Sequence, residues 1–146
     1  MIRSYLKKDE QEVITLLRLN SPKYFDPSEE KDFIDYLNKF SDNYFVFLEK
    51  NKIIACGGFN FFENKTQARI SWDIVHPDFH GKGIGKKLTL FRINEIKKEP
   101  TLQTIIVRTS QLAYQFYGKL GFELKEIKKD FWALGFDLYL MELPIK

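Results

Sequence analysis

The segment that most constrains this chain is an apolar run that ends in a turn, a glycine-rich loop and a helical pattern. The run Ile70–Val75 is β-prone, and glycines occupy alternate positions of the following loop Gly81–Gly85. Apolar residues then recur at helical spacing at Ile84, Leu88 and Phe91. Glycines allow close approach of the backbone to a ligand, and a helix begins with unpaired N–H donors at its positive dipole end. The pattern therefore predicts a strand, a loop and a helix start that bind phosphate or pyrophosphate.

The spacing of the glycines excludes three common classes of phosphate-binding loop. A P-loop requires G-x-x-x-x-G-K-S/T, and Gly81–Gly85 is too short and lacks the hydroxyl residue. A Rossmann fingerprint requires G-x-G-x-x-G near the start of a βαβ unit, whereas here the third glycine comes one position early and the motif lies in mid-chain. A kinase glycine loop joins two strands, but a helical pattern follows this one. Lys82, Lys86 and Lys87 add screened positive charge around the loop.

The residues around this loop resemble the acyl-CoA binding signature of the GNAT N-acetyltransferases. That signature reads Q/R-x-x-G-x-G/A, and the chain has His80-Gly81-Lys82-Gly83-Ile84-Gly85, preceded by Val75-x-Pro77. His80 departs from the signature at its first position. We expect this change to be tolerated, because backbone N–H groups make most of the phosphate contacts.

A second segment resembles the other signature of the same family, N-x-x-A-x-x-F/L-Y-x-K-x-G-F. It spans Ser110–Phe122, in which Ser110 stands where Asn is usual. The matching residues are Ala113, Phe116, Tyr117, Lys119, Gly121 and Phe122. The resemblance is specific over Ile70–Phe122 and only topological elsewhere.

The resemblance implies an α/β chain with the acyl-CoA N-acyltransferase fold. That fold has a central, mixed and mostly antiparallel sheet with one splayed pair of parallel strands and helices on both faces, and the pantetheine arm of acetyl-CoA lies in the wedge. Cofactor contacts are then expected from Ile74, Val75, His76, His80, Gly81, Lys82, Gly83, Ile84, Gly85, Lys86, Ser110, Ala113 and Phe116.

The hydrophobic pattern supports this topology independently. A strand, a long helix and a strand form a βαβ crossover, so the strands at Val75 and Val107 are predicted to be parallel neighbours. Strands are predicted at 2–6, 44–49, 52–61, 66–75, 104–109, 122–128 and 136–143, and helices at 8–19, from Pro27 onward, at 81–98 and at 112–120.

Two side chains are candidates for proton transfer. Tyr117 matches the motif tyrosine that points at the CoA sulfur in this family, and a phenol is protonated at neutral pH and can donate to a thiolate. Asp73 and Glu63 are candidate bases for the amine. The alternatives are a tyrosine that only packs in the core and carboxylates with a structural or solvated role. The group that polarises the thioester carbonyl is expected to be a backbone N–H within Ile74–His76.

Other conspicuous residues have plainer interpretations. His76 and His80 straddle Pro77 and are not joined by a third ligand motif, so no metal site is predicted. Cys56 is expected to be a buried strand residue. The pair Gly57-Gly58 is expected to mark a bulge or a close approach to a ligand.

Composition sets broad limits. With 146 residues, a net charge of +3 and one cysteine, the chain is expected to be a single domain, residues 1–146, in a reducing cytoplasm. No block of basic residues predicts nucleic-acid binding. The segment Met1–Lys8 lacks the apolar core of a signal peptide, and no apolar run is long enough to cross a membrane.

Together these features predict an N-acetyltransferase that moves an acetyl group from acetyl-CoA to a primary amine by direct attack in a ternary complex. A small-molecule amine, such as a polyamine, an amino acid or an aminoglycoside, is the preferred acceptor. The alternatives are a protein N-terminus or lysine as the acceptor, or a non-catalytic acyl-CoA-binding module. The family resemblance also allows a homodimer through the last strands. Aromatic residues expected near the acceptor, or else in the core, are Tyr24, Phe25, Phe62, Phe131 and Trp132.

Overall fold

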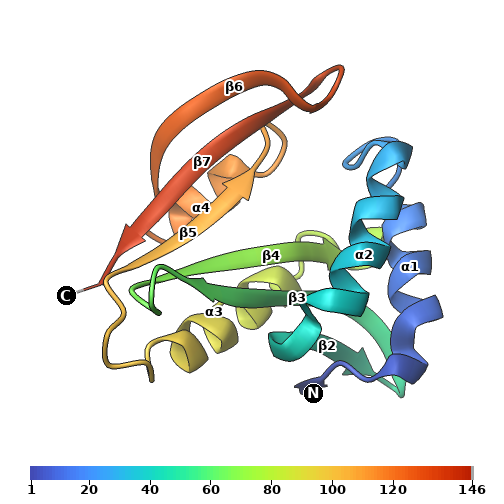
Figure 1. Cartoon of the computed structure of the whole chain (residues 1–146). Coiled ribbons are helices and arrows are strands. Elements are labelled where there is room, and N and C mark those ends of the chain that lie inside the picture. Colours follow the sequence, from blue (N-terminus) through green and yellow to red (C-terminus); the bar gives the residue numbers. More distant parts are fainter. Residues whose placement is uncertain (146) are drawn as a thin grey trace.

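A seven-stranded sheet forms the centre of the computed structural model, which describes residues 1–145 (Figure 1). Its strand order is β1-β2-β3-β4-β5-β7-β6. Every neighbouring pair is antiparallel except β4 and β5, which are parallel, as the sequence predicts. The strands are β1 (Ile2–Ser4), β2 (Tyr44–Glu49), β3 (Lys52–Phe62), β4 (Gln67–Val75), β5 (Thr104–Thr109), β6 (Glu123–Ala133) and β7 (Phe136–Pro144).

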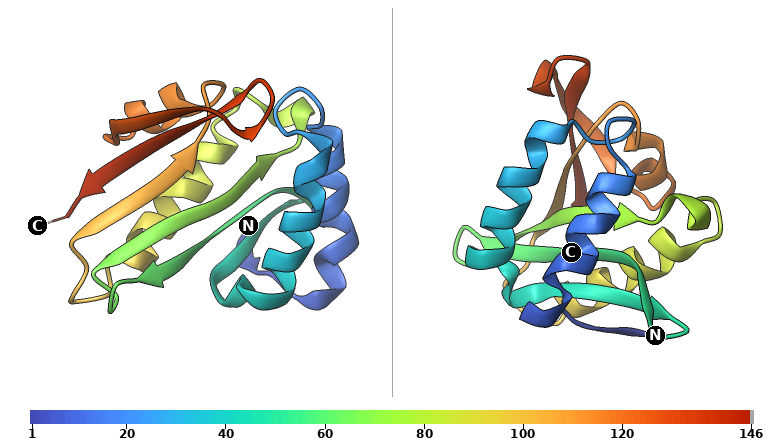
Figure 2. Two further views of the ribbon diagram at one scale, coloured as in Figure 1. Left: turned by 45° about the horizontal axis from the view of Figure 1, so that its top comes forward. Right: turned by 90° about the vertical axis from the view of Figure 1, so that its right-hand side faces the viewer.

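Helices cover both faces of the sheet, which confirms the expected layers (Figures 1 and 2). The helices α1 (Glu10–Leu19) and α2 (Glu30–Lys39) pack on one face, where Val13, Leu17 and Phe33 form a core with the sheet. The helices α3 (Ile84–Ile96) and α4 (Tyr114–Lys119) pack on the other face in a second core. None of the described helices has the length and apolarity that a membrane crossing requires.

The helix after the glycine loop begins later than the sequence pattern suggests. It starts at Ile84 rather than Gly81, because Gly81 and Gly83 have φ angles of +75° and +80°. Left-handed residues of this kind cannot belong to a right-handed helix, and glycine adopts them without strain. The helix in the second sequence signature, α4, also begins later than predicted, at Tyr114 rather than at residue 112.

The parallel pair is joined over only part of its length. Residues Gln67–Ile70 of β4 pair with Thr104–Val107 of β5, and the pairing ends there. Beyond Ile70 the two strands diverge, so the splay expected from the family resemblance is present. It leaves the end of β4, including Asp73 and Val75, without a neighbour on that edge.

A β-bulge in β4 lies at the point where the splay begins. Ser71 pairs with Gly58 and Ile74 pairs with Cys56, so β4 has one more residue than β3 between these pairs. Trp72 takes up the extra length with a φ of +53°. A bulge of this kind bends the strand and reverses which face its later side chains occupy. Strict alternation along β4 is therefore interrupted between Ser71 and Trp72 and resumes after the bulge.

Candidate active site in the strand splay

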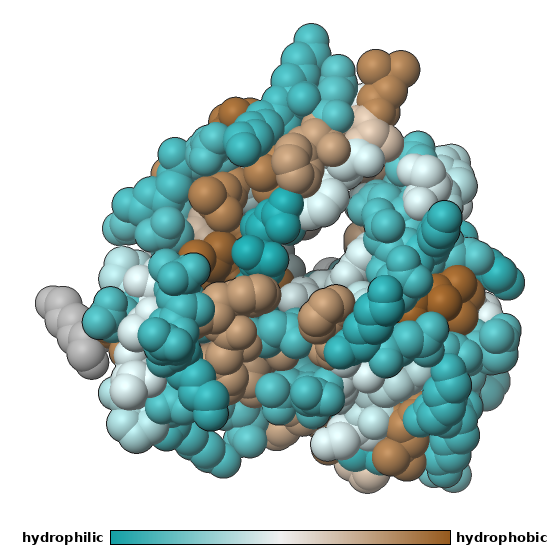
Figure 3. All heavy atoms as spheres, viewed as in Figure 1, coloured by the Kyte–Doolittle hydropathy of each residue, from teal (hydrophilic) through white to brown (hydrophobic). Residues whose placement is uncertain are grey.

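A cleft of about 1220 Å³ follows the splay between β4 and β5. It is lined by these two strands, the start of α3, α4 and the loop between α1 and α2. Figure 3 shows the molecule hollowed between the β6–β7 hairpin and the α1–α2 pair. Both sequence signatures contribute to the lining, one through the glycine loop and the other through Ser110–Tyr117.

The glycine loop presents backbone donors to one end of the cleft. The first intrahelical bond of α3 runs from the Lys87 N–H to the Gly83 carbonyl over 3.1 Å. The N–H groups of residues 84–86 precede it and have no partner within the helix. A Cβ added to Gly81 or Gly83 would meet no atom within 4 Å, so the space above the loop is open. These features fit an anionic phosphate ligand at the helix start.

His80 ties the glycine loop to the end of β4. Its Nε2 lies 2.7 Å from the Val75 carbonyl oxygen, which only accepts, so this nitrogen carries the proton. Asn20 donates to the same oxygen over 3.1 Å. The residue that departs from the family signature therefore ties the loop to the end of β4.

The N–H group of Val75 is the donor that faces the splay. The neighbouring His76 N–H donates to the Ile54 carbonyl over 2.8 Å and so points toward β3. Backbone N–H groups of a strand alternate between its two edges, so the N–H of Val75 points toward the open edge. Within the predicted range Ile74–His76, Val75 is the residue whose geometry suits polarisation of a carbonyl.

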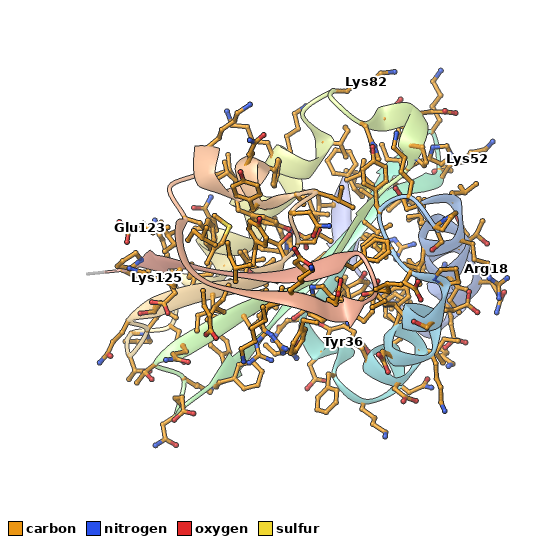
Figure 4. All side chains as sticks on the ribbon, turned by 90° about the horizontal axis from the view of Figure 1, so that it is seen from above. Arg18, Tyr36, Lys52, Lys82, Glu123 and Lys125 are labelled. Atoms are coloured by element: carbon orange, nitrogen blue, oxygen red, sulfur yellow. The ribbon has the colours of Figure 1, made fainter. Side chains whose placement is uncertain are left out.

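Three predicted cofactor residues differ in how they face the cleft. Lys86 lines it, together with Ile74, Ile84 and Gly85. Lys82 does not: it projects away from the body of the molecule, with its ammonium 5.3 Å from the centre of the Phe79 ring (Figure 4). His76 is also outside the lining, and its Nδ1 accepts the N–H of Asp78 over 3.1 Å.

The second signature builds the opposite wall. The hydroxyl of Ser110 accepts the N–H of Leu112 over 3.2 Å, and its carbonyl accepts the N–H groups of residues 113 and 114. Ser110 therefore fixes the turn into α4 where the family usually has Asn. Phe116 packs against the start of α3, so closely that a Cβ on Gly85 would lie 3.4 Å from its ring. Ala113, Phe116 and Tyr117 all line the cleft.

Tyr117, Asp73 and Arg92 form one connected group at the middle of the cleft. The Tyr117 hydroxyl donates to one oxygen of Asp73, and Arg92 Nη1 donates to the other. Arg92 is fully buried in α3 and also donates to the Gly58 carbonyl over 3.0 Å and to Thr89 over 3.2 Å. Asp73 thus faces α3 and α4, whereas Trp72 and Ile74 join the α1–α2 core.

Burial and charge shift the proton equilibria of this group. Burial, followed by the charge of Asp73, raises the pKa of Tyr117 well above its usual value, so the phenol is protonated at neutral pH. Burial opposes the charge on Arg92, but Asp73 outweighs it and keeps the pKa of the guanidinium above its usual value. The Asp73 carboxyl therefore lies between a neutral phenol and the Arg92 guanidinium.

Gly57 is required by the close packing of this group. A Cβ at Gly57 would lie 2.7 Å from Asp73 Oδ1 and 2.8 Å from Arg92 Nη1. The close approach at Gly57 is therefore to two side chains of the protein itself, and the extra residue of the bulge belongs to the facing strand β4. Arg92 is not among the site residues that the sequence predicts. The available signal was a single arginine on the stripe formed by Leu88, Arg92 and Ile96, whose other members are apolar and buried.

The aromatic residues expected near the acceptor mostly reach the cleft. Tyr24, Phe25, Phe62 and Trp132 line it, whereas Phe131 does not. Glu63, the second candidate base, is exposed in the β3–β4 turn and lies outside the lining.

Cys56 lies in β3, as the sequence predicts. Cys56 is fully buried, and burial raises the pKa of its thiol to about 12, so it is not a nucleophile at neutral pH. Within residues 1–145, no group of three or more His, Cys, Asp or Glu side chains is placed to hold a metal ion.

Comparison with known proteins identifies the family. The profile of the acetyltransferase (GNAT) domain matches residues 41–124, more than half of the chain. The chain belongs to the GNAT acetyltransferase family. An uncharacterized N-acetyltransferase, ycf52, from Gracilaria tenuistipitata var. liui is 35% identical over 99 residues, which are 62% of this chain and 54% of the relative. The chain thus spans about half of the length of this curated relative.

Solved structures share the GNAT fold along the whole chain. An aminoglycoside 6'-N-acetyltransferase complexed with coenzyme A has a TM-score of 0.79 at 15% identity, with 100% of this chain and 97% of that one covered. The ribosomal-protein-S18-alanine N-acetyltransferase from Escherichia coli has a TM-score of 0.81 at 21% identity, with 100% and 94% covered. At these identities the similarity establishes the fold.

Proposed function

We propose that this GNAT protein transfers an acetyl group from acetyl-CoA to the primary amine of a small molecule. The observation that carries the proposal is the single cleft that joins the glycine loop at one end to the Tyr117–Asp73 pair in the middle. A phosphate-binding helix start and a proton-handling pair are the two elements that acetyl transfer from CoA requires.

The cofactor is assigned to the wall formed by α3 and α4. Residues 84–86 would bind the pyrophosphate through their N–H groups, with Lys86 adding charge. Bound acetyl-CoA would supply an acetyl group activated as a thioester. The N–H of Val75 would donate to the thioester oxygen, and Phe116 and Ala113 would position the arm of the cofactor.

The hydrogen-bonded pair Tyr117–Asp73 handles the protons. As the amine nitrogen bonds to the acetyl carbon and the carbon–sulfur bond breaks, Asp73 takes the proton of the amine, directly or through water. Tyr117 gives its hydroxyl proton to the departing sulfur and recovers one from Asp73 through the hydrogen bond that joins them. Arg92 holds Asp73 in place and is a positioning residue.

The first test is thermal unfolding with acetyl-CoA, CoA, NAD and ATP in parallel. A ligand at about 100 times its dissociation constant stabilises the folded state by about 2.7 kcal/mol. At about 2–4 °C or more per kcal/mol, the midpoint should rise by several degrees with the two CoA species only. A larger shift with NAD or ATP would contradict the assignment of the loop.

The second test is thiol release from acetyl-CoA with a panel of small amines and with peptides that have free N-termini or lysines. Turnover on small amines supports the proposal, and exclusive use of peptides would replace it with protein acetylation. Binding of CoA with no turnover on either class would indicate an acyl-CoA-binding module. Asp73→Asn should lower kcat, whereas an unchanged kcat would exclude Asp73 as the base.

A further inference from the structure

Two arginines lie side by side on the face of the sheet that α3 does not cover. Arg69 of β4 pairs with Ile106 of β5, and Arg108 lies two residues farther along β5, so the two side chains are diagonal neighbours on one face. The alternate residues Ala68 and Ile70 are buried in the α3 core. The arginines therefore point the other way, and both line the cleft.

Neither arginine has a counter-charge within the described residues. The chain has five arginines, and the other three form ion pairs, Arg3 with Asp9, Arg18 with Glu30 and Arg92 with Asp73. Within residues 1–145, no carboxylate lies within 4 Å of Arg69 or Arg108, although Glu142 occupies the same row of the sheet opposite Ile106. The Nε of Arg69 is buried without a hydrogen-bond acceptor. Groups of this kind are normally paired when they are buried.

Aromatic rings hold both guanidinium groups in place. The Cζ of Arg69 lies 4.3 Å from the centre of the Phe62 ring, and that of Arg108 lies 5.2 Å from Phe131 and 5.3 Å from Trp132. A guanidinium over an aromatic ring is attracted to the ring face and keeps N–H donors available for a carboxylate. Burial and then the charge of Arg108 lower the pKa of Arg69, and an anion between the two would offset the repulsion between their charges.

The phosphates of the cofactor are too far away to be this anion. Six residues of β4 separate Arg69 from Val75, where the glycine loop departs, and this corresponds to about 20 Å of strand. The arginines also lie on the opposite face of β4 from Asp73, which contacts α3 and α4. An anion bound between the two arginines is therefore not a phosphate of the cofactor.

We propose that the acceptor is an amine that also carries a carboxylate, and that Arg69 and Arg108 bind this carboxylate. The inference rests on the proposed acetyltransferase function and names its substrate class. Polyamines and aminoglycosides are polycations, which two unpaired guanidinium groups repel. Four residues of β4, or about 13 Å of strand, separate Arg69 from Asp73, so the acceptor holds its amine and carboxylate several bonds apart.

The test compares ω-amino acids of increasing chain length with their carboxamides at saturating acetyl-CoA, by thiol release. Charge-assisted bonds to carboxylate are worth about 1.5–3 kcal/mol, so the acids should exceed their amides in kcat/KM by about tenfold or more at the best length. Arg69→Gln and Arg108→Gln should each remove most of this preference by raising KM for the acid, with KM for acetyl-CoA unchanged. Lys52→Gln, a loss of an exposed charge at the start of β3, should leave the preference intact (Figure 4).

Two outcomes would overturn the inference while the acetyltransferase proposal stands. One is equal use of acids and amides, and the other is better use of polyamines or of phosphoethanolamine, whose anion is a phosphate. If no amine is acetylated, the proposed function fails, and calorimetric titration of the ω-amino acids into the CoA-bound protein decides the inference separately. Binding that both Gln variants weaken supports it, and the absence of binding overturns it.

Discussion

At the scale of single residues, the proposal depends most on the Tyr117 hydroxyl, which donates to Asp73 in the cleft. Tyr117→Phe removes this proton donor and keeps the ring packed against Phe116 and Phe122. Since a positioned general acid contributes about 10²–10⁴-fold, kcat should fall by about that factor, with the acetyl-CoA dissociation constant unchanged. Steady-state kinetics measure kcat, and a thermal-shift titration measures the acetyl-CoA dissociation constant. An unchanged kcat would exclude Tyr117 from the mechanism.

The second prediction at this scale concerns a Cβ atom added at Gly57. Gly57→Ala places a Cβ 2.7 Å from Asp73 Oδ1, so the ion pair of Asp73 and Arg92 must shift to make room. We expect a loss of about 1–3 kcal/mol in the free energy of unfolding, together with lower kcat. Gly118→Ala in α4 is the matched control, because a Cβ there meets nothing within 4 Å. Equal denaturant midpoints for the two variants would show that Gly57 is not under steric constraint.

At the scale of elements, the start of α3 depends on the left-handed residues before it. Gly83 has a φ of +80° with open space around it, so Gly83→Ala is strained by its backbone and not by contacts. We expect a loss of about 1–2 kcal/mol and weaker CoA binding, because the strain disturbs the loop that presents the N–H groups. Gly83→Asn should retain more of both properties, since Asn adopts this conformation more readily. Titration calorimetry measures the affinity for CoA of the parent chain, Gly83→Ala and Gly83→Asn. Equal affinities of the three proteins would contradict the assignment of this loop to phosphate binding.

At the scale of the whole molecule, buried neutral groups predict alkaline instability. Burial raises the pKa of Cys56 from 9.0 to about 12, and the pKa values of Tyr44 and Tyr117 are also raised. The unfolded chain releases these protons first, so their stabilisation is complete below pH 9 and is lost as the pH rises toward 12. The free energy of unfolding should fall above pH 9 by at most about 1.4 kcal/mol per pH unit for each group.

Cys56→Ala isolates one of these contributions. Urea unfolding at a series of pH values between 9 and 10 should give a flatter dependence for this variant than for the parent chain, because the tyrosines contribute equally to both proteins and only the thiol differs. The comparison concerns the slope with pH, so a small change in packing at the mutated site does not obscure it. Parallel slopes would show that the thiol does not contribute.

The local sequence determined the family, the glycine loop, the order of the elements and the Tyr117 position, because these depend on residue types at short fixed spacings. Only the tertiary structure showed the partners of Asp73, which come from helices 19 and 44 residues away in sequence. The bulge at Trp72 reverses which side of the sheet the later side chains of β4 occupy. No local sequence pattern predicts it, because it arises from the pairing with β3. The juxtaposition of Arg69 and Arg108 likewise results from the register between two parallel strands, which is set by how the crossover helix packs on the sheet.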